Sequence, residues 1–110
     1  MKALDALWGA TLREFIFNLP THSLVLNGEA TENGITRFFS LVMREIIDLR
    51  FVDPDARLWD YAEITSVQVR RPEPNSPLII RIVFWKEEWS LTVHCRSIEL
   101  NERPVEVEGV

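Results

Sequence analysis

Apolar and polar residues alternate with a period of two in several segments of this chain, and no other sequence feature constrains its fold as strongly. The alternation runs through residues 12–19, 22–30, 63–71 and 89–96, and residues 78–85 form a strand-like segment rich in Ile and Val. Successive side chains of a strand point to opposite faces of a sheet, so this period predicts short strands with one covered face. Tight turns between such strands predict antiparallel pairing.

Three short segments supply the predicted turns. Asn33-Gly34 is the dipeptide that best accepts two successive positive φ angles, as a type I′ hairpin requires. Residues 72–77 hold three prolines between two strand-like segments, which favours a hairpin loop over a linker between domains. Residues 86–88 are expected to turn the strand that precedes them.

Residues 35–51 fit two patterns. A helical period places Phe38, Phe39 and Val42 on one face, whereas the preceding Asn-Gly turn favours a hairpin partner. We interpret the segment as strands with a break near Arg44 and Glu45. Residues 98–100 are expected to extend the strand 89–96 past a bulge.

Two helical segments are predicted. Residues 3–10 form a short helical lead that Gly9 would end. Asp53 and Pro54 are favourable at a helix start, and they predict one turn through Trp59.

The predicted fold class is therefore mainly β, a β-rich α+β fold. We expect a curved antiparallel sheet or a small sandwich of six to eight short strands, with one or two short helices. The 110 residues make a single domain, 1–110, that can bury a core of its own. Its tail, 102–110, is expected to be an edge strand or flexible.

Charge and composition exclude several classes of protein. A net charge of -5 argues against a nucleic-acid partner. No apolar run approaches the roughly 20 residues of a membrane span, so no membrane association is expected. The start of the chain does not read as a secretory signal, and its single cysteine cannot form an internal disulfide. A cytoplasmic location is expected.

The residues that could do chemistry do not form a known catalytic or metal-binding pattern. Cys95 and His94 are neighbours on a strand and must point to opposite faces, so Cys95 is expected in the core. His22 completes a set of two histidines and one cysteine that matches no zinc spacing. No metal and no cofactor are expected.

Paired carboxylates are the other candidates. Glu87 and Glu88 lie in a predicted turn and are expected to be solvated, whereas Asp60 and Glu63 flank Tyr61. A third hypothesis, an enzyme of unknown class, predicts a cleft in which Asp60 or Glu63 comes within hydrogen-bond reach of His22 or His94. With no catalytic motif in view, we expect a protein that is not an enzyme.

Aromatic residues are the more informative set. Six phenylalanines and one tyrosine join four tryptophans in 110 residues. They either fill a small β core or form a surface that anchors a partner or holds an apolar ligand. The residues predicted to bind are Trp59, Tyr61, Glu63, Trp85 and Trp89.

Four segments carry a family resemblance: residues 59–66 (WDYAEITS), Trp8-Gly9, residues 15–17 and Leu49-Arg50-Phe51. Together these segments resemble small bacterial proteins of the YxiG-like kind over residues 8–100. The resemblance implies a β-rich single domain. Some relatives lie near polymorphic toxin genes, which implies an immunity protein. It supplies no functional residue.

These observations lead to one expected function and one alternative. We expect a non-enzymatic protein-interaction module, with a toxin-neutralising immunity protein as its specific form and a toxin as its protein partner. The alternative is a small apolar-ligand-binding protein with a pocket inside the curved sheet. A homodimer is expected in either case, because two apolar sheet faces are readily covered by a second copy.

Overall fold

One antiparallel sheet of nine strands makes up almost the whole of the computed structural model, which describes residues 2–54, 58–86 and 89–106. The elements, in chain order, are α1 (Lys2–Asp5), β1 (Thr11–Asn18), β2 (Ser23–Glu32), β3 (Ile35–Arg44), β4 (Asp48–Val52), β5 (Ala62–Arg70), β6 (Leu78–Phe84), β7 (Ser90–Cys95), β8 (Ser97–Leu100) and β9 (Arg103–Pro104). The order of strands in the sheet is β4-β7-β6-β5-β1-β2-β3-β8-β9.

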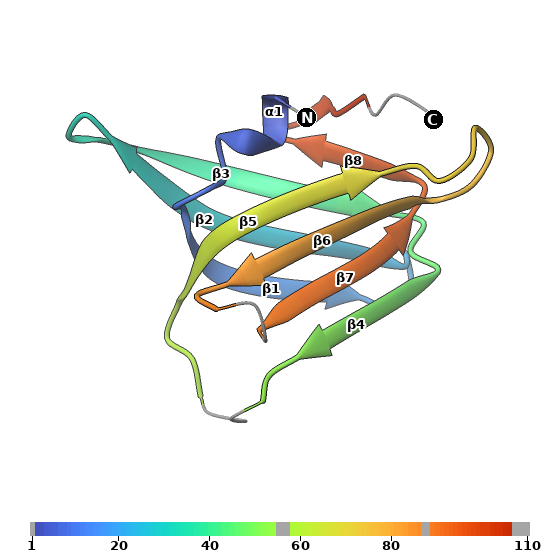
Figure 1. Cartoon of the computed structure of the whole chain (residues 1–110), viewed down its shortest axis with the longest axis horizontal. Coiled ribbons are helices and arrows are strands. Elements are labelled where there is room, and N and C mark those ends of the chain that lie inside the picture. The colour runs from blue at the N-terminus through green and yellow to red at the C-terminus, as the bar shows by residue number, and fades with distance from the viewer. Residues whose placement is uncertain (1, 55–57, 87–88, 107–110) are drawn as a thin grey trace.

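The sheet folds back on itself into two layers. Figure 1 shows β5, β6, β7 and β4 in front, with β1, β2, β3 and β8 behind them. Only two residue pairs, Thr11 with Glu63 and Leu12 with Ala62, join β1 to β5 within the strands. Beyond them the front and rear layers separate, so the sheet stays open between β1 and β4.

Gly9 lies in a backbone irregularity just before β1. Its N–H donates to the carbonyl of Ile64 at 2.7 Å, and the N–H of Ile64 donates to the carbonyl of Ala10 at 2.8 Å. With φ of +83° at Gly9, this is a β-bulge that begins with glycine, the residue that adopts such a φ without strain. The bulge joins the N-terminal turn to β5 and starts the bend between the layers.

The core lies between the two layers. Buried side chains of the rear layer include Leu24, Leu26, Leu41, Met43 and Ile98, and those of the front layer include Ile64, Ile80, Ile82, Leu91, Val93 and Cys95. Inward residues follow one another at every second position, as the alternation in the sequence predicts.

Several predictions of local structure are confirmed. Residues 35–51 form two strands, β3 and β4, and the chain breaks between them at Glu45, which has φ of +53°. Asn33 and Gly34 have φ of +52° and +77° in the hairpin between β2 and β3. The proline-rich segment 72–77 connects β5 to β6, which pair with each other.

The predicted mainly β fold is confirmed, but its details differ: the described residues form nine strands instead of six to eight, and almost no helix. The helix among them has four residues, Lys2–Asp5, and does not reach Gly9. Residues 97–100 do not extend the preceding strand. Instead the chain crosses at Arg96, whose N–H donates to the carbonyl of Arg44, and β8 pairs with β3 in the other layer.

Two predicted segments are described only in part. Of the turn expected from Asp53 to Trp59, neither end residue is helical, and residues 55–57 lie outside the described residues. In the expected edge strand or flexible tail, Arg103 and Pro104 form β9 against β8, and residues 107–110 are outside the described part. No helix in the described ranges is long and apolar enough to cross a membrane.

The hydrogen bonds between β3 and the β8 side show, strand by strand, which backbone groups of β1 point away from β2, toward the open side of the sheet. The N–H of Asn101 donates to the carbonyl of Ser40, so even-numbered residues of β3 direct their backbone groups toward β8. Alternation turns odd-numbered residues of β2 toward β1, and they pair there with even-numbered residues of β1. Phe15 and Phe17 therefore direct their N–H and C=O groups away from β2, where no strand of the described chain pairs with them.

This register gives a testable pattern of amide exchange. The amides of Ile16 and Asn18 should exchange with solvent at least about tenfold more slowly than those of Phe15 and Phe17, because only the first pair donates to β2. Hydrogen exchange followed by NMR measures this directly. Equal protection of all four amides would contradict the open edge.

Gly28 gives a second test of the packing. A Cβ atom at this position would lie 2.7 Å from Cε2 of Phe39 and would also collide with the carbonyl oxygen of Thr11. Gly28→Ala should therefore lower the free energy of unfolding by about 2 kcal/mol, as overpacking does. Urea unfolding checks this value. The control is Gly34→Asn, which should be tolerated because Asn accepts a positive φ and the space there is open.

Candidate functional site: an aromatic mouth between the layers

A chain of aromatic rings lies at the open side of the sheet. We call it the aromatic mouth and define it as Phe15, Phe51, Trp59, Tyr61 and Trp85. Ring centroids are 5.8 Å apart for Phe15 and Phe51, 5.3 Å for Phe51 and Trp59, 4.6 Å for Trp59 and Trp85, and 6.3 Å for Tyr61 and Trp85. The rings are tilted or edge-on to one another, which is the favourable arrangement for aromatic pairs.

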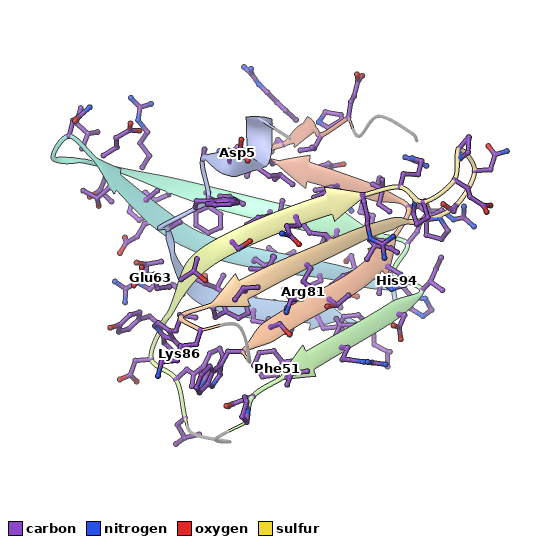
Figure 2. All side chains as sticks on the ribbon, in the orientation of Figure 1. Asp5, Phe51, Glu63, Arg81, Lys86 and His94 are labelled. Atoms are coloured by element: carbon purple, nitrogen blue, oxygen red, sulfur yellow. The ribbon has the colours of Figure 1, made fainter. Side chains whose placement is uncertain are left out.

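The rings come from four separate parts of the chain. Phe15 points inward from β1, Phe51 points inward from β4, Trp59 and Tyr61 lie in the segment before β5, and Trp85 follows β6. Figure 2 shows Phe51 near the end of β4 and Lys86 at the same lower side of the molecule, just after the end of β6. The site therefore depends on the whole fold and not on a local motif.

The rings of the aromatic mouth are only partly covered. Relative exposure is 40% for Phe15, 46% for Phe51, 50% for Tyr61 and 36% for Trp85. Phe84 lies at the base of the mouth, fully buried, with its ring 5.8 Å from that of Trp59. The mouth is thus an exposed continuation of the core.

Two hollows of about 400 Å³ each open on either side of Trp59. The interlayer hollow is lined by Leu12, Phe15, Leu49, Phe51, Asp53, Leu58, Trp59 and Phe84. The outer hollow is lined by Leu58, Trp59, Asp60, Tyr61, Trp85, Lys86 and Trp89. The interlayer hollow is almost wholly apolar, whereas the outer one adds a carboxylate and an ammonium group.

Polar contacts hold the frame of the mouth. Nε1 of Trp89 donates to Oδ1 of Asp53 at 3.0 Å, which ties the end of β4 to the start of β7. The guanidinium of Arg13 lies 5.7 Å from the centre of the Tyr61 ring, within range of a cation–π interaction. Across the described residues, no buried side-chain polar atom lacks a hydrogen-bond partner.

Trp85 has an unusual backbone conformation. Its φ of +52° lies in the left-handed region, which a bulky aromatic residue rarely adopts. Its N–H donates to the carbonyl of Glu63 at 3.0 Å, so the chain is held in this turn by β5. The turn brings the indole against Trp59.

The structure brings together four of the five residues predicted to bind. Trp59, Tyr61, Trp85 and Trp89 all line the outer hollow. Glu63 does not line either hollow: its side chain is exposed on β5, opposite Thr11, and its carbonyl holds Trp85. Whether these residues bind a partner stays a prediction.

Sequence reasoning missed half of this site. Phe15, Leu49, Phe51 and Leu58 were not predicted to bind, although they line the interlayer hollow. The alternation in residues 12–19 already placed Phe15 and Phe17 on one face of a strand. The alternation could not show that β5 stops pairing with β1 after Leu12, which leaves the face of β1 that carries Phe15 and Phe17 exposed.

Asp60, His22 and His94 lie in different parts of the described structure. Asp60 lines the outer hollow, and His22 lines a different depression with Pro20, Glu45 and Arg96. His94 lies on β7 opposite Asp48, toward the other end of the front layer (Figure 2). Glu87 and Glu88 are outside the described residues.

Metal-binding clusters are likewise absent from the described ranges. No group of three or more His, Cys, Asp or Glu side chains there is placed to hold a metal ion. Cys95 is fully buried opposite Leu78, as expected from its place among core residues.

No protein-family model matches this chain, and no curated protein matches it either. The resemblance to YxiG-like proteins therefore stays a prediction. The fold and the mouth together define a two-layered antiparallel β domain with an open aromatic edge.

Cys95 yields a prediction about reactivity and pH. Burial raises the pKa of its thiol from 9.0 to about 11, since the thiolate is poorly solvated in the core. The thiol should therefore resist Ellman's reagent at pH 8 in the native protein and react at once in guanidinium chloride. Rapid native labelling would contradict the buried position.

The same shift has a consequence for stability, because the folded protein favours the neutral thiol. The contribution of Cys95 is fully present below the unfolded pKa and is lost as pH rises through about 11. Thermal unfolding between pH 9 and pH 11 should show a smaller loss of Tm in Cys95→Ala than in the wild type.

Proposed function

We propose that this chain is a protein-interaction module that binds a partner protein through the aromatic mouth. The observation that carries the proposal is the row of partly exposed aromatic rings, each in contact with the next, around two open hollows. Aromatic side chains that are half covered and rigidly held are the usual anchors of protein interfaces.

The conformation of Trp85 supports the proposal. A left-handed φ costs an L residue about 1–2 kcal/mol. Such strain tends to be kept at binding sites, where the surrounding structure fixes it. Here it positions an indole that is still 36% exposed, so packing of the monomer core alone does not account for it.

Charge favours a basic partner. The chain carries a net charge of -5, and Asp60 lines the outer hollow beside the rings. An acidic surface attracts a cationic protein and speeds their encounter. Lys86, which also lines the outer hollow, gives the site one group for an acidic side chain of the partner.

The specific form we propose is an immunity protein that neutralises a toxin by covering it. Its support is the resemblance of residues 59–66 to YxiG-like proteins, some of which lie near toxin genes. Blocking by contact requires a surface with a few anchors and no catalytic group. The separation of Asp60 from His22 agrees with a non-enzymatic role.

One observation favours a second candidate, the binding of a small apolar molecule. The interlayer hollow measures about 400 Å³ and its walls are almost entirely apolar. Ligand pockets of roughly 300–1,000 Å³ are common. Native mass spectrometry of the purified protein would detect a retained ligand, which a pure protein-binding module would lack.

A homodimer is a further way to cover the mouth. Light scattering at several concentrations measures the mass in solution. If the mouth is the dimer contact, Trp85→Asn should shift the protein toward the monomer of 12.8 kDa.

Trp85→Asn is also the sharpest test of the main proposal. Asn accepts a left-handed φ, so relief of strain should offset the lost ring contacts and the Tm should change little. Affinity for the partner should fall by at least about tenfold, as for an interface anchor. The measurement is isothermal titration against toxin candidates encoded by the neighbouring genes.

Trp8→Ala is the matched control. Trp8 is 53% exposed but takes no part in the aromatic mouth, so its loss should leave the affinity unchanged. The proposal fails if none of the neighbouring gene products binds, or if Trp85→Asn binds as tightly as the wild type.

A further inference from the structure

We infer that the partner binds by adding an extended segment as a new strand along the free edge of β1, over residues 13–18, with apolar side chains at alternate positions entering the aromatic mouth. This inference rests on the proposed function and names how the partner is held. It follows from the backbone of β1, from the side chains that face the mouth and from the shape of the opening.

The backbone of β1 is prepared for another strand. After Leu12, β1 pairs only with β2 among the described strands. Phe15 and Phe17 turn their N–H and C=O groups toward the open side, as the register in the sheet requires. A row of such groups is a template for an added strand.

The free edge of β1 lacks the usual protection over residues 15–17, beyond the bulge and the charged side chains at Arg13 and Glu14. Exposed edges are normally blunted by charged side chains, prolines or very short strands. The edge strand β9 is short and contains Pro104, and β4 carries Asp48 and Arg50 on its outer face. In β1, by contrast, residues 15–17 are Phe, Ile and Phe, with relative exposures of 40%, 47% and 41%.

Space for a strand begins where β5 leaves β1. A small hollow of about 120 Å³ lies between residues 12–15 and residues 59–62, at the point where the two chains diverge. Beyond it the rings of Phe15 and Phe51 meet across the mouth. A strand beside β1 would place every second side chain next to these rings, which is why those positions of the partner should be apolar.

The shape of the opening favours a single extended chain over a second copy of this protein. In Figure 1 the end of β4 lies lower than β1, and β1 lies behind the front layer. The free edge of β1 is therefore partly screened by β4. The rings of Phe15 and Phe51 meet across the opening, so β4 lies on the far side of the mouth from this edge. A copy pairing β1 with β1 would have to bring its own front layer into the same space.

Two variants at one position separate backbone pairing from side-chain contact. Phe17→Ala removes the ring and keeps the N–H that faces the open edge. Phe17→Pro removes both, and proline is tolerated at an edge position whose N–H has no partner in the sheet. The melting temperatures of the two variants show whether both fold.

The probes are peptides of about seven residues, the length of an ordinary strand, selected from a random displayed library against the immobilised wild-type protein. Each is compared with a copy that is N-methylated at alternate amides. We expect enrichment of apolar residues at alternate positions. On peptide binding, the amides of Phe15 and Phe17 should gain at least about tenfold protection from exchange.

The Phe17→Pro protein should bind at least about tenfold more weakly than Phe17→Ala, because one interstrand hydrogen bond and its alignment are lost. The N-methylated peptides should bind more weakly still. If no selected peptide binds at the mouth, strand addition is overturned, whereas the proposed function fails only if the titrations with neighbouring gene products also show no binding. If peptides quench Trp59 and Trp85 fluorescence but leave Phe15 and Phe17 unprotected, or if the two Phe17 variants bind alike, only strand addition is overturned. Strand addition to β1 is also overturned if the amides of Leu49 and Phe51 gain protection from exchange instead, or if dimerisation of the protein blocks peptide binding.

Discussion

The short antiparallel pairing of β1 with β5 is the constraint on which the rest of this structure depends. Two residue pairs and the glycine bulge beside them hold the front and rear layers to one sheet. Because backbone groups must be paired or solvated, each strand that leaves this junction needs a new partner or an open edge. β5 pairs with β6, whereas the second half of β1 pairs with β2 on one side and faces the solvent on the other.

Hydrophobic packing then makes the open side chemically distinct. Elsewhere the inward rows of the two layers cover each other completely, from Leu24 and Leu41 to Ile80 and Leu91. Where the layers part, the same inward row continues into Phe15 and Phe51. Their rings contact each other, and that of Phe51 contacts Trp59, yet they stay 40% and 46% exposed. The aromatic mouth is therefore core sequence left at the surface by topology.

The sequence predicts the elements of this fold better than their assembly. Period-two spacing and the Asn33-Gly34 turn suffice to locate most strands, since both act within a few residues. They cannot show that the chain changes layer at Arg96, because pairing of Ile98 with Met43 depends on residues far apart in the sequence. For the same reason Trp59, Trp85 and Trp89 could be selected by type, whereas Phe51 could be recognised only from its neighbours in space.

The indole of Trp59 stands as a shared wall between the interlayer and the outer hollows. A molecule that fills one side and rotates this ring changes the room left on the other. Thermodynamic linkage makes such an influence reciprocal: whatever the first occupant does to the affinity of the second, the second does to the first. Occupants of the two hollows would thus be linked through the side chains that both hollows share, Leu58 and Trp59.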